Sequence, residues 1–92
     1  MSYSFSRAVP LVAGVISSVP TMLSGVSVRE TAGAAATVRI FDNASAGSGT
    51  LLATIGLTAL QSTSVDRNVP TVAANGIFVV ITGTVEGNIR IP

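Results

Sequence analysis

The sequence has 92 residues, a formal charge of +1 and a mean hydropathy of +0.67, and only 10% of its residues are charged. This length accommodates one small domain, and an apolar fraction of 48% excludes a disordered chain. Cys, His, Trp and Lys are absent, which excludes thiolate and imidazole chemistry and a disulfide framework.

Strands dominate the expected secondary structure, since 30 residues are Val, Ile or Thr, and Gly and Pro recur at the spacing of short antiparallel strands. The first strand is expected at residues 9–16 (VPLVAGVI), as an edge strand or an extended arm, because Pro10 cannot donate a ladder hydrogen bond. Arg7 and this apolar run imitate a signal peptide, but Pro10 and Gly14 interrupt the run, and we expect it to remain in the mature protein. No apolar stretch is long enough for a membrane helix, so no membrane partner is expected.

The next strands are predicted at residues 22–30 and 35–41. In the first, the apolar alternation slips at Gly25, which predicts a bulge. In the second, Val38 and Ile40 are expected to face the core, with Thr37 and Arg39 facing outward.

A Gly-rich loop is expected at residues 44–49 (ASAGSG), after a turn that Asp42 caps through its own backbone. The loop lacks the Lys and the helix of a phosphate-binding loop. Residues 50–56 (TLLATIG) fit a helical stripe as well as a strand face of Leu51, Ala53 and Ile55, and their Thr and Gly content favours the strand.

The C-terminal third is predicted to contain a strand at residues 61–67, closed by residues 68–70. Asn75-Gly76 predicts a type I′ hairpin turn that joins residues 70–73 to a strand at 77–82 (IFVVIT). This strand is apolar on both faces, so Phe78 and Val80 need a second cover. A turn at residues 86–88 and a short strand at 89–91 end the chain.

Charged and polar residues suggest no catalytic or binding site. A metal cage or a pair of catalytic carboxylates would need most of the four acids in one place, and the 21 Ser and Thr residues have no His or Lys to activate them. The five Arg residues form no basic stripe, and we expect salt bridges from Arg39 and Arg90. The sequence therefore predicts a protein that is not an enzyme and that has no catalytic, cofactor-binding or metal site, no cofactor and no direct nucleic-acid partner.

The surplus of apolar surface is more informative. A chain of this size buries only about 60 to 65% of its unfolded surface, and contiguous exposed apolar patches usually mark protein interfaces. The alternative is an ordinary sandwich that hides them all. The apolar residues expected at an interface come from the first strand and the two-faced strand. They are Val9, Leu11, Val12, Val15, Ile16, Phe78 and Val80.

Five segments also carry a family resemblance: residues 26–33 (VSVRETAG), 36–43 (ATVRIFDN), 49–53 (GTLLA), 75–80 (NGIFVV) and 82–88 (TGTVEGN). Their succession of strands and turns resembles small β-sandwich structural proteins of tailed-bacteriophage virions. The resemblance covers residues 22–92 and leaves 1–21 as an N-terminal arm or edge strand. It implies a capsid decoration or cement protein on the capsid exterior, commonly a trimer, which binds the major capsid protein or other virion proteins and has no catalytic residues.

Together, the residues and the resemblance predict a single all-β antiparallel sandwich, jelly-roll-like or immunoglobulin-like, of seven or eight short strands with an extended N-terminal arm. The expected function is stabilisation of a viral capsid, with the arm adding a strand to a neighbouring sheet. The alternative is a receptor- or glycan-binding module displayed on a phage particle, as a spike, tail or connector component. Tyr3, Phe5, Phe41 and Phe78 are too few and too dispersed along the chain to favour an aromatic glycan platform.

Overall fold

The computed structural model describes residues 7–92, with side chains described for 7–65 and 71–92. This part of the chain is built from strands alone, as the sequence predicted. The strands are β1 (Arg7–Pro10), β2 (Gly14–Ser17), β3 (Thr21–Glu30), β4 (Ala36–Asp42), β5 (Thr50–Leu57), β6 (Ser62–Ala73), β7 (Ile77–Thr82) and β8 (Val85–Ile91). No helix in the described residues has the length and apolar character needed to span a membrane.

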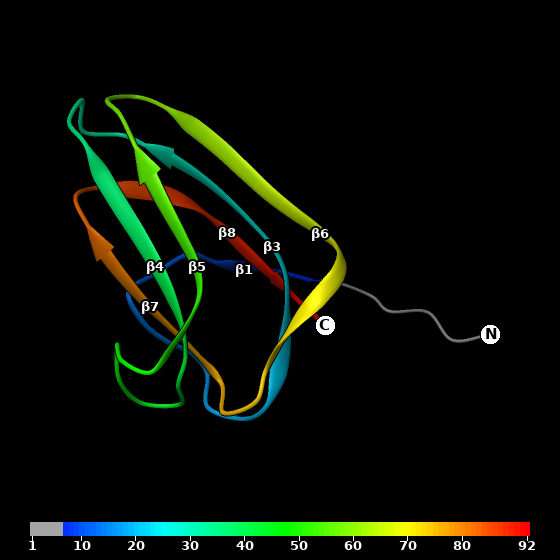
Figure 1. Cartoon of the computed structure of the whole chain (residues 1–92). Coiled ribbons are helices and arrows are strands. Elements are labelled where there is room, and N and C mark those ends of the chain that lie inside the picture. The colour runs from blue at the N-terminus through cyan, green and yellow to red at the C-terminus, as the bar shows by residue number, and fades with distance from the viewer. Residues whose placement is uncertain (1–6) are drawn as a thin grey trace.

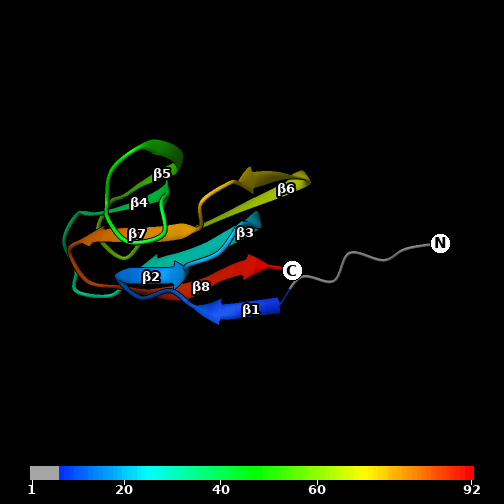
Figure 2. The ribbon, with the colours of Figure 1, turned by 90° about the horizontal axis from the view of Figure 1, so that it is seen from below.

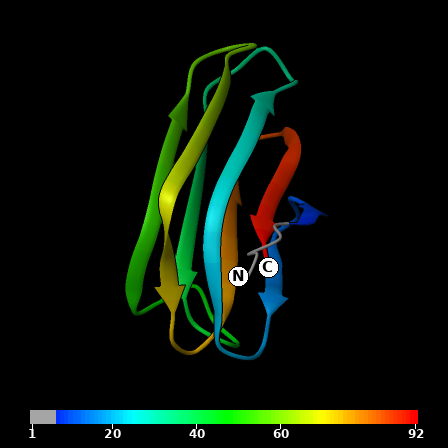
Figure 3. The ribbon, with the colours of Figure 1, turned by 90° about the vertical axis from the view of Figure 1, so that its right-hand side faces the viewer.

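The strands form two antiparallel four-stranded sheets, packed face to face as a β-sandwich (Figures 1 and 3). Sheet A has the order β1-β8-β3-β6, and sheet B has the order β2-β7-β4-β5. The pairings are nested: β4 pairs with β5, β3 with β6, β2 with β7 and β1 with β8. A long antiparallel hairpin rolled up in this way is a jelly roll, so the strand order distinguishes between the two sandwich types expected from the sequence.

The middle of the chain forms the strands that were predicted. In β4, Val38 and Ile40 are buried, Arg39 is exposed and Thr37 is half-buried, in agreement with the predicted alternation. The β3–β6 register shifts between Leu23 and Gly25, which confirms the irregularity predicted at Gly25. Residues 50–57 are a strand rather than a helix.

The predicted first strand is in fact two strands. β1 pairs with β8 in sheet A, and β2 pairs with β7 in sheet B, with residues 11–13 crossing between the sheets (Figure 2). Leu11 lies in this crossing and points into the core. Residues 7–17 are therefore edge strands of the sandwich, and of the predicted arm only residues 1–6 lie outside the described part.

Three predicted turns are also wrong. β6 does not end at residues 68–70 but continues through them. Residues 67–70 of β6 lie opposite a single residue of β3, Ser24, so the regular β3–β6 pairing is interrupted there and tolerates Pro70, which has no N–H to donate. Asn75-Gly76 is not a type I′ hairpin, because β6 and β7 lie in different sheets and Asn75 lacks a positive φ. Residues 86–88 lie inside β8, and the chain turns at Gly83 (φ 96°) instead.

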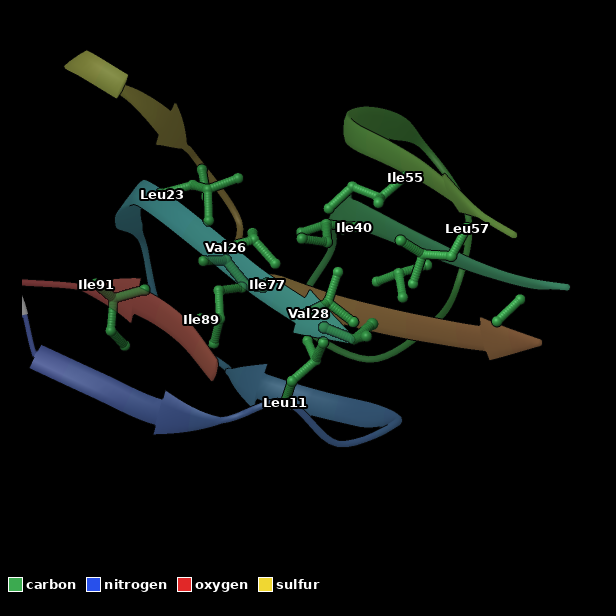
Figure 4. Packing of buried hydrophobic residues seen from close by; sticks show 14 residues of the cluster. Leu11, Leu23, Val26, Val28, Ile40, Ile55, Leu57, Ile77, Ile89 and Ile91 are labelled. Carbon is green, nitrogen blue, oxygen red and sulfur yellow. The ribbon is translucent and has the colours of Figure 1, made fainter. Parts of the chain in front are cut away.

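One apolar core fills the space between the sheets, and both sheets contribute to it (Figure 4). Its side chains come from six strands, β3 to β8, and from the β1–β2 crossing. They are Leu11, Leu23, Val26, Val28, Ala36, Val38, Ile40, Ile55, Leu57, Ala73, Ile77, Val79, Ile89 and Ile91. Burial of a Val, Leu or Ile contributes about 1.5–3 kcal/mol each, so this cluster is the main source of stability.

Candidate functional site: the outer face of sheet B

A row of apolar side chains crosses all four strands of sheet B on the face that points away from the core. The register places Val15 of β2 opposite Phe78 of β7, Phe78 opposite Phe41 of β4, and Phe41 opposite Leu51 of β5. We call these four residues the apolar row. The two Phe residues, 37 positions apart in the sequence, are thus direct cross-strand neighbours and are not dispersed in the fold, while Tyr3 and Phe5 lie outside the described residues.

The ends of the apolar row are the most exposed. Val15 and Leu51 are each 47% exposed, while Phe41 and Phe78 are half-buried. Leu51 was expected to share a face with Ile55, but the β4–β5 register shifts between Ile40 and Phe41. This irregularity turns Leu51 outward while Ile55 stays in the core, because a one-residue shift exchanges the two faces of a strand.

The loop between β4 and β5 covers part of this face. It crosses β7 in Figure 2, and a Cβ built on Gly47 would lie 2.5 Å from Val80 Cγ2 and 3.6 Å from Phe78 Cε1. The second cover that the two-faced strand requires therefore comes in part from the chain's own Gly-rich loop. Its small residues allow the backbone to approach closely, but they add little apolar surface.

Side-chain hydrogen bonds shape the loop. Asn43 Oδ1 accepts from the backbone N–H groups of Ser45 (2.8 Å) and Ala46 (2.9 Å), and Asn43 Nδ2 donates to the carbonyl of Ser48 (3.0 Å). Asn43 thus caps the turn in place of Asp42, whose Oδ1 instead accepts from the N–H of Asn75 at 2.7 Å. That bond ties the β6–β7 connection to the end of β4 beside the apolar row.

The seven residues predicted for an interface do not form one surface. Leu11 belongs to the core, and Val9 and Ile16 are half-buried against it. Val12 and Val15 are exposed, but only Val15 joins the apolar row. Phe78 lies in the row, and Val80 lies beside it, opposite Arg39. The prediction missed Phe41 and Leu51, although the alternation that buries Val38 and Ile40 already implied that Phe41 points outward.

Glu30 is the one charged side chain fully buried among those described, and it fastens loops at one end of the sandwich. Its Oε1 accepts from the N–H groups of Leu60 (2.8 Å), Gly33 (2.8 Å) and Ala34 (3.1 Å), and its Oε2 accepts from Ala32 (2.6 Å). The bond from Leu60, followed by those from the three loop residues, lowers the pKa of Glu30 despite desolvation. Each carboxylate oxygen is occupied by the protein itself, so the arrangement is structural.

The described residues form no group of three or more acidic side chains that could hold a metal ion. What the outer face of sheet B offers is apolar contact surface, with Arg39 and Thr54 at its polar end. Comparisons with protein-family models, curated proteins and solved structures find no match to this chain.

Proposed function

We propose that this chain is a structural protein of a virion, and that it docks through the apolar row of sheet B. The observation that carries the proposal is the row itself, with Val15, Phe78, Phe41 and Leu51 aligned across four strands and its ends 47% exposed. The outer face of an antiparallel sheet is normally polar, and contiguous apolar patches mark protein contacts.

The kind of assembly is proposed on two further grounds. The first is the resemblance of residues 22–92 to small virion proteins of tailed bacteriophages. The second is the jelly-roll arrangement, which is widespread among viral capsid domains, although a fold alone does not fix a function. On these grounds the protein is a capsid decoration or cement protein that binds the major capsid lattice from outside as an oligomer, with a trimer favoured by the resemblance.

We place the docking contact on sheet B and not on the N-terminal arm that the sequence suggested. Deleting residues 1–16 would remove β1, most of β2 and the core residue Leu11, so the loss of binding would only report unfolding. Substitutions on the exposed ends of the row leave the core intact and test docking directly.

The experiment compares the wild type with a Val15→Asp, Leu51→Asp double variant. Native mass spectrometry across a concentration series gives the oligomeric state, and co-sedimentation with purified capsids of the phage whose genome encodes the chain gives the affinity. Because each Asp would be desolvated in the contact, we expect binding to weaken by at least about 100-fold.

A Val72→Asp variant is the matched control, since Val72 is 63% exposed on β6 and lies outside the apolar row. We expect it to bind as the wild type does. A wild type that stays monomeric and ignores capsids would overturn the proposal, as would a double variant that sediments with capsids as well as the wild type does.

A further inference from the structure

The outer face of sheet A carries a shallow, open hollow of about 760 Å³, on the opposite side of the sandwich from the apolar row. It extends over β8, β3 and β6. Most of its lining residues are polar, in contrast to the apolar row, and the argument rests on Ser27, Arg29, Ser62, Ser64, Glu86 and Asn88. A volume of this size lies within the range of small-molecule sites, roughly 300–1,000 Å³.

The register arranges these side chains in two rows of three. Arg29 of β3 lies between Glu86 of β8 and Ser62 of β6. The adjacent row places Ser27 between Asn88 and Ser64. Residues far apart in the sequence thus present two charges of opposite sign, three hydroxyls and one amide toward the same space.

A hydrogen-bond network holds the second row in place. Arg90 Nη1 donates to Ser27 Oγ and to Asn88 Oδ1, both at 2.9 Å, and Ser27 Oγ lies 3.0 Å from Ser64 Oγ. The guanidinium lies over Gly25, where a Cβ would come within 2.5 Å of Arg90 Nη2. The polar groups on the floor are therefore preorganised, which lowers the entropic cost of binding a ligand.

A glycine also lets two strands of the floor lie close together. A Cβ on Gly87 would lie 2.0 Å from the carbonyl oxygen of Ser27, so only glycine lets β8 approach β3 this closely. Gly87 pairs with the buried Val28, so the position of its missing side chain lies on the core side of β8, and Gly87 lines the hollow with its backbone.

We propose that this hollow binds a neutral saccharide. Hydroxyl, amide and carboxylate groups match the hydrogen-bonding groups of sugars, and the charges of Arg29 and Glu86 cancel among the residues that line the hollow. The guanidinium of Arg90, beside them, already donates to Ser27 and Asn88. Jelly-roll sandwiches also include lectin domains. The site needs neither the apolar row nor a capsid, so it stands or falls independently of the docking proposal.

The test is an NMR titration of the ¹⁵N-labelled full chain with a panel of neutral mono- to trisaccharides, at sugar concentrations up to about 10 mM, where weak millimolar binding is measurable. We expect at least one sugar to shift the amide signals of β3, β6 and β8 and to leave those of sheet B unchanged. The Arg29→Ala and Glu86→Ala variants should each raise Kd at least tenfold.

Arg39→Ala is the matched control, because Arg39 is an exposed, outward-facing Arg of sheet B. It should leave Kd unchanged. The proposal is overturned if no neutral sugar shifts β3, β6 and β8, if Arg29→Ala binds as the wild type does, or if inorganic phosphate or an acidic sugar binds there in preference to every neutral one.

Discussion

The two outer faces of the sandwich have the same backbone arrangement and opposite chemistry. On sheet B, cross-strand partners in one row are Val15, Phe78, Phe41 and Leu51. On sheet A, a corresponding row holds Asn88, Ser27 and Ser64. The ladder hydrogen bonds are alike in kind, so the side chains alone decide that one face is suited to a protein contact and the other to a polar ligand.

The two faces also differ in how the rest of the chain contacts them. On the polar face, Arg90 holds Ser27 and Asn88 in place through two hydrogen bonds. The apolar face is covered only in part, by a loop of small residues around Gly47, and its ends remain exposed. Covering the exposed ends of the apolar row with a partner would be favourable, because it removes apolar surface from water.

The largest expected effect is a loss of stability from a core substitution that leaves binding by both faces unchanged. Ile40 is fully buried between the sheets, so Ile40→Ala should lower the free energy of unfolding by roughly 2–5 kcal/mol through lost contacts and a cavity. Urea unfolding followed by circular dichroism measures this loss. While the variant remains folded, its affinity for capsids and for sugars should be that of the wild type.

The neighbouring Arg39→Ala serves as its control, because this exposed side chain should change stability by no more than about 0.5 kcal/mol. Equal losses at positions 39 and 40 would contradict the inward and outward assignment of β4.

A substitution at Glu30 tests how much its buried carboxylate stabilises the loops at one end of the sandwich, away from both faces. In Glu30→Gln an amide NH₂ replaces one carboxylate oxygen and opposes a backbone N–H donor, so the variant should be less stable at neutral pH. The pKa of Glu30 is lower in the folded state than its ordinary value of 4.5, so its charged form stabilises the fold above that pH. That stabilisation is lost as the pH falls through the lowered pKa.

Thermal unfolding of both proteins between pH 7 and pH 2 measures this effect. The gap between wild type and variant should be constant above about pH 5 and shrink in acid. A gap independent of pH would show that the carboxylate charge does not contribute.

Local patterns in the sequence predicted much of the fold. Alternation assigned β4, and the slip at Gly25 marked an irregularity that the structure contains. The predictions failed where sheets exchange strands. Asn75-Gly76 has the composition of a hairpin turn, yet the chain there passes from sheet A to sheet B, and only the tertiary pairing determines this.

The candidate site was predictable only in fragments. Val15 and Phe78 were expected at an interface, but the row needs Phe41 and Leu51 beside them. Cross-strand register and the irregularity that turns Leu51 outward are products of the assembled sheet, and no short-range pattern encodes them. Leu11 was misplaced for the same reason, because the run 9–16 divides between two sheets and its middle enters the core.

A smaller effect is expected from the loop over sheet B. Gly47→Val would place its side chain against Val80 and Phe78, so the loop must move away and expose them. We expect a loss of about 1–3 kcal/mol in unfolding free energy, together with increased binding of a fluorescent apolar dye. Gly56→Val is the matched control. Gly56 also lies in sheet B, on β5, and a Cβ there would meet nothing within 4 Å. A Gly47 variant with unchanged stability and dye binding would show that the loop does not cover the face.

The smallest expected effect is a small gain in stability that leaves binding by both faces unchanged. Leu60 is an exposed residue with a positive φ of 59°, a conformation that costs a side chain such as Leu roughly 1 kcal/mol, whereas Asn adopts it more readily. Its N–H donates to Glu30 Oε1, and Asn retains this donor. Leu60→Asn should therefore raise the unfolding free energy by up to about 1 kcal/mol in urea titration. Leu60→Val, which is β-branched and poorly suited to this φ, should lower it. Because Leu60 lies in the β5–β6 loop, outside both the apolar row and the polar hollow, a change in either binding activity would mean that the two faces are coupled through this end of the sandwich.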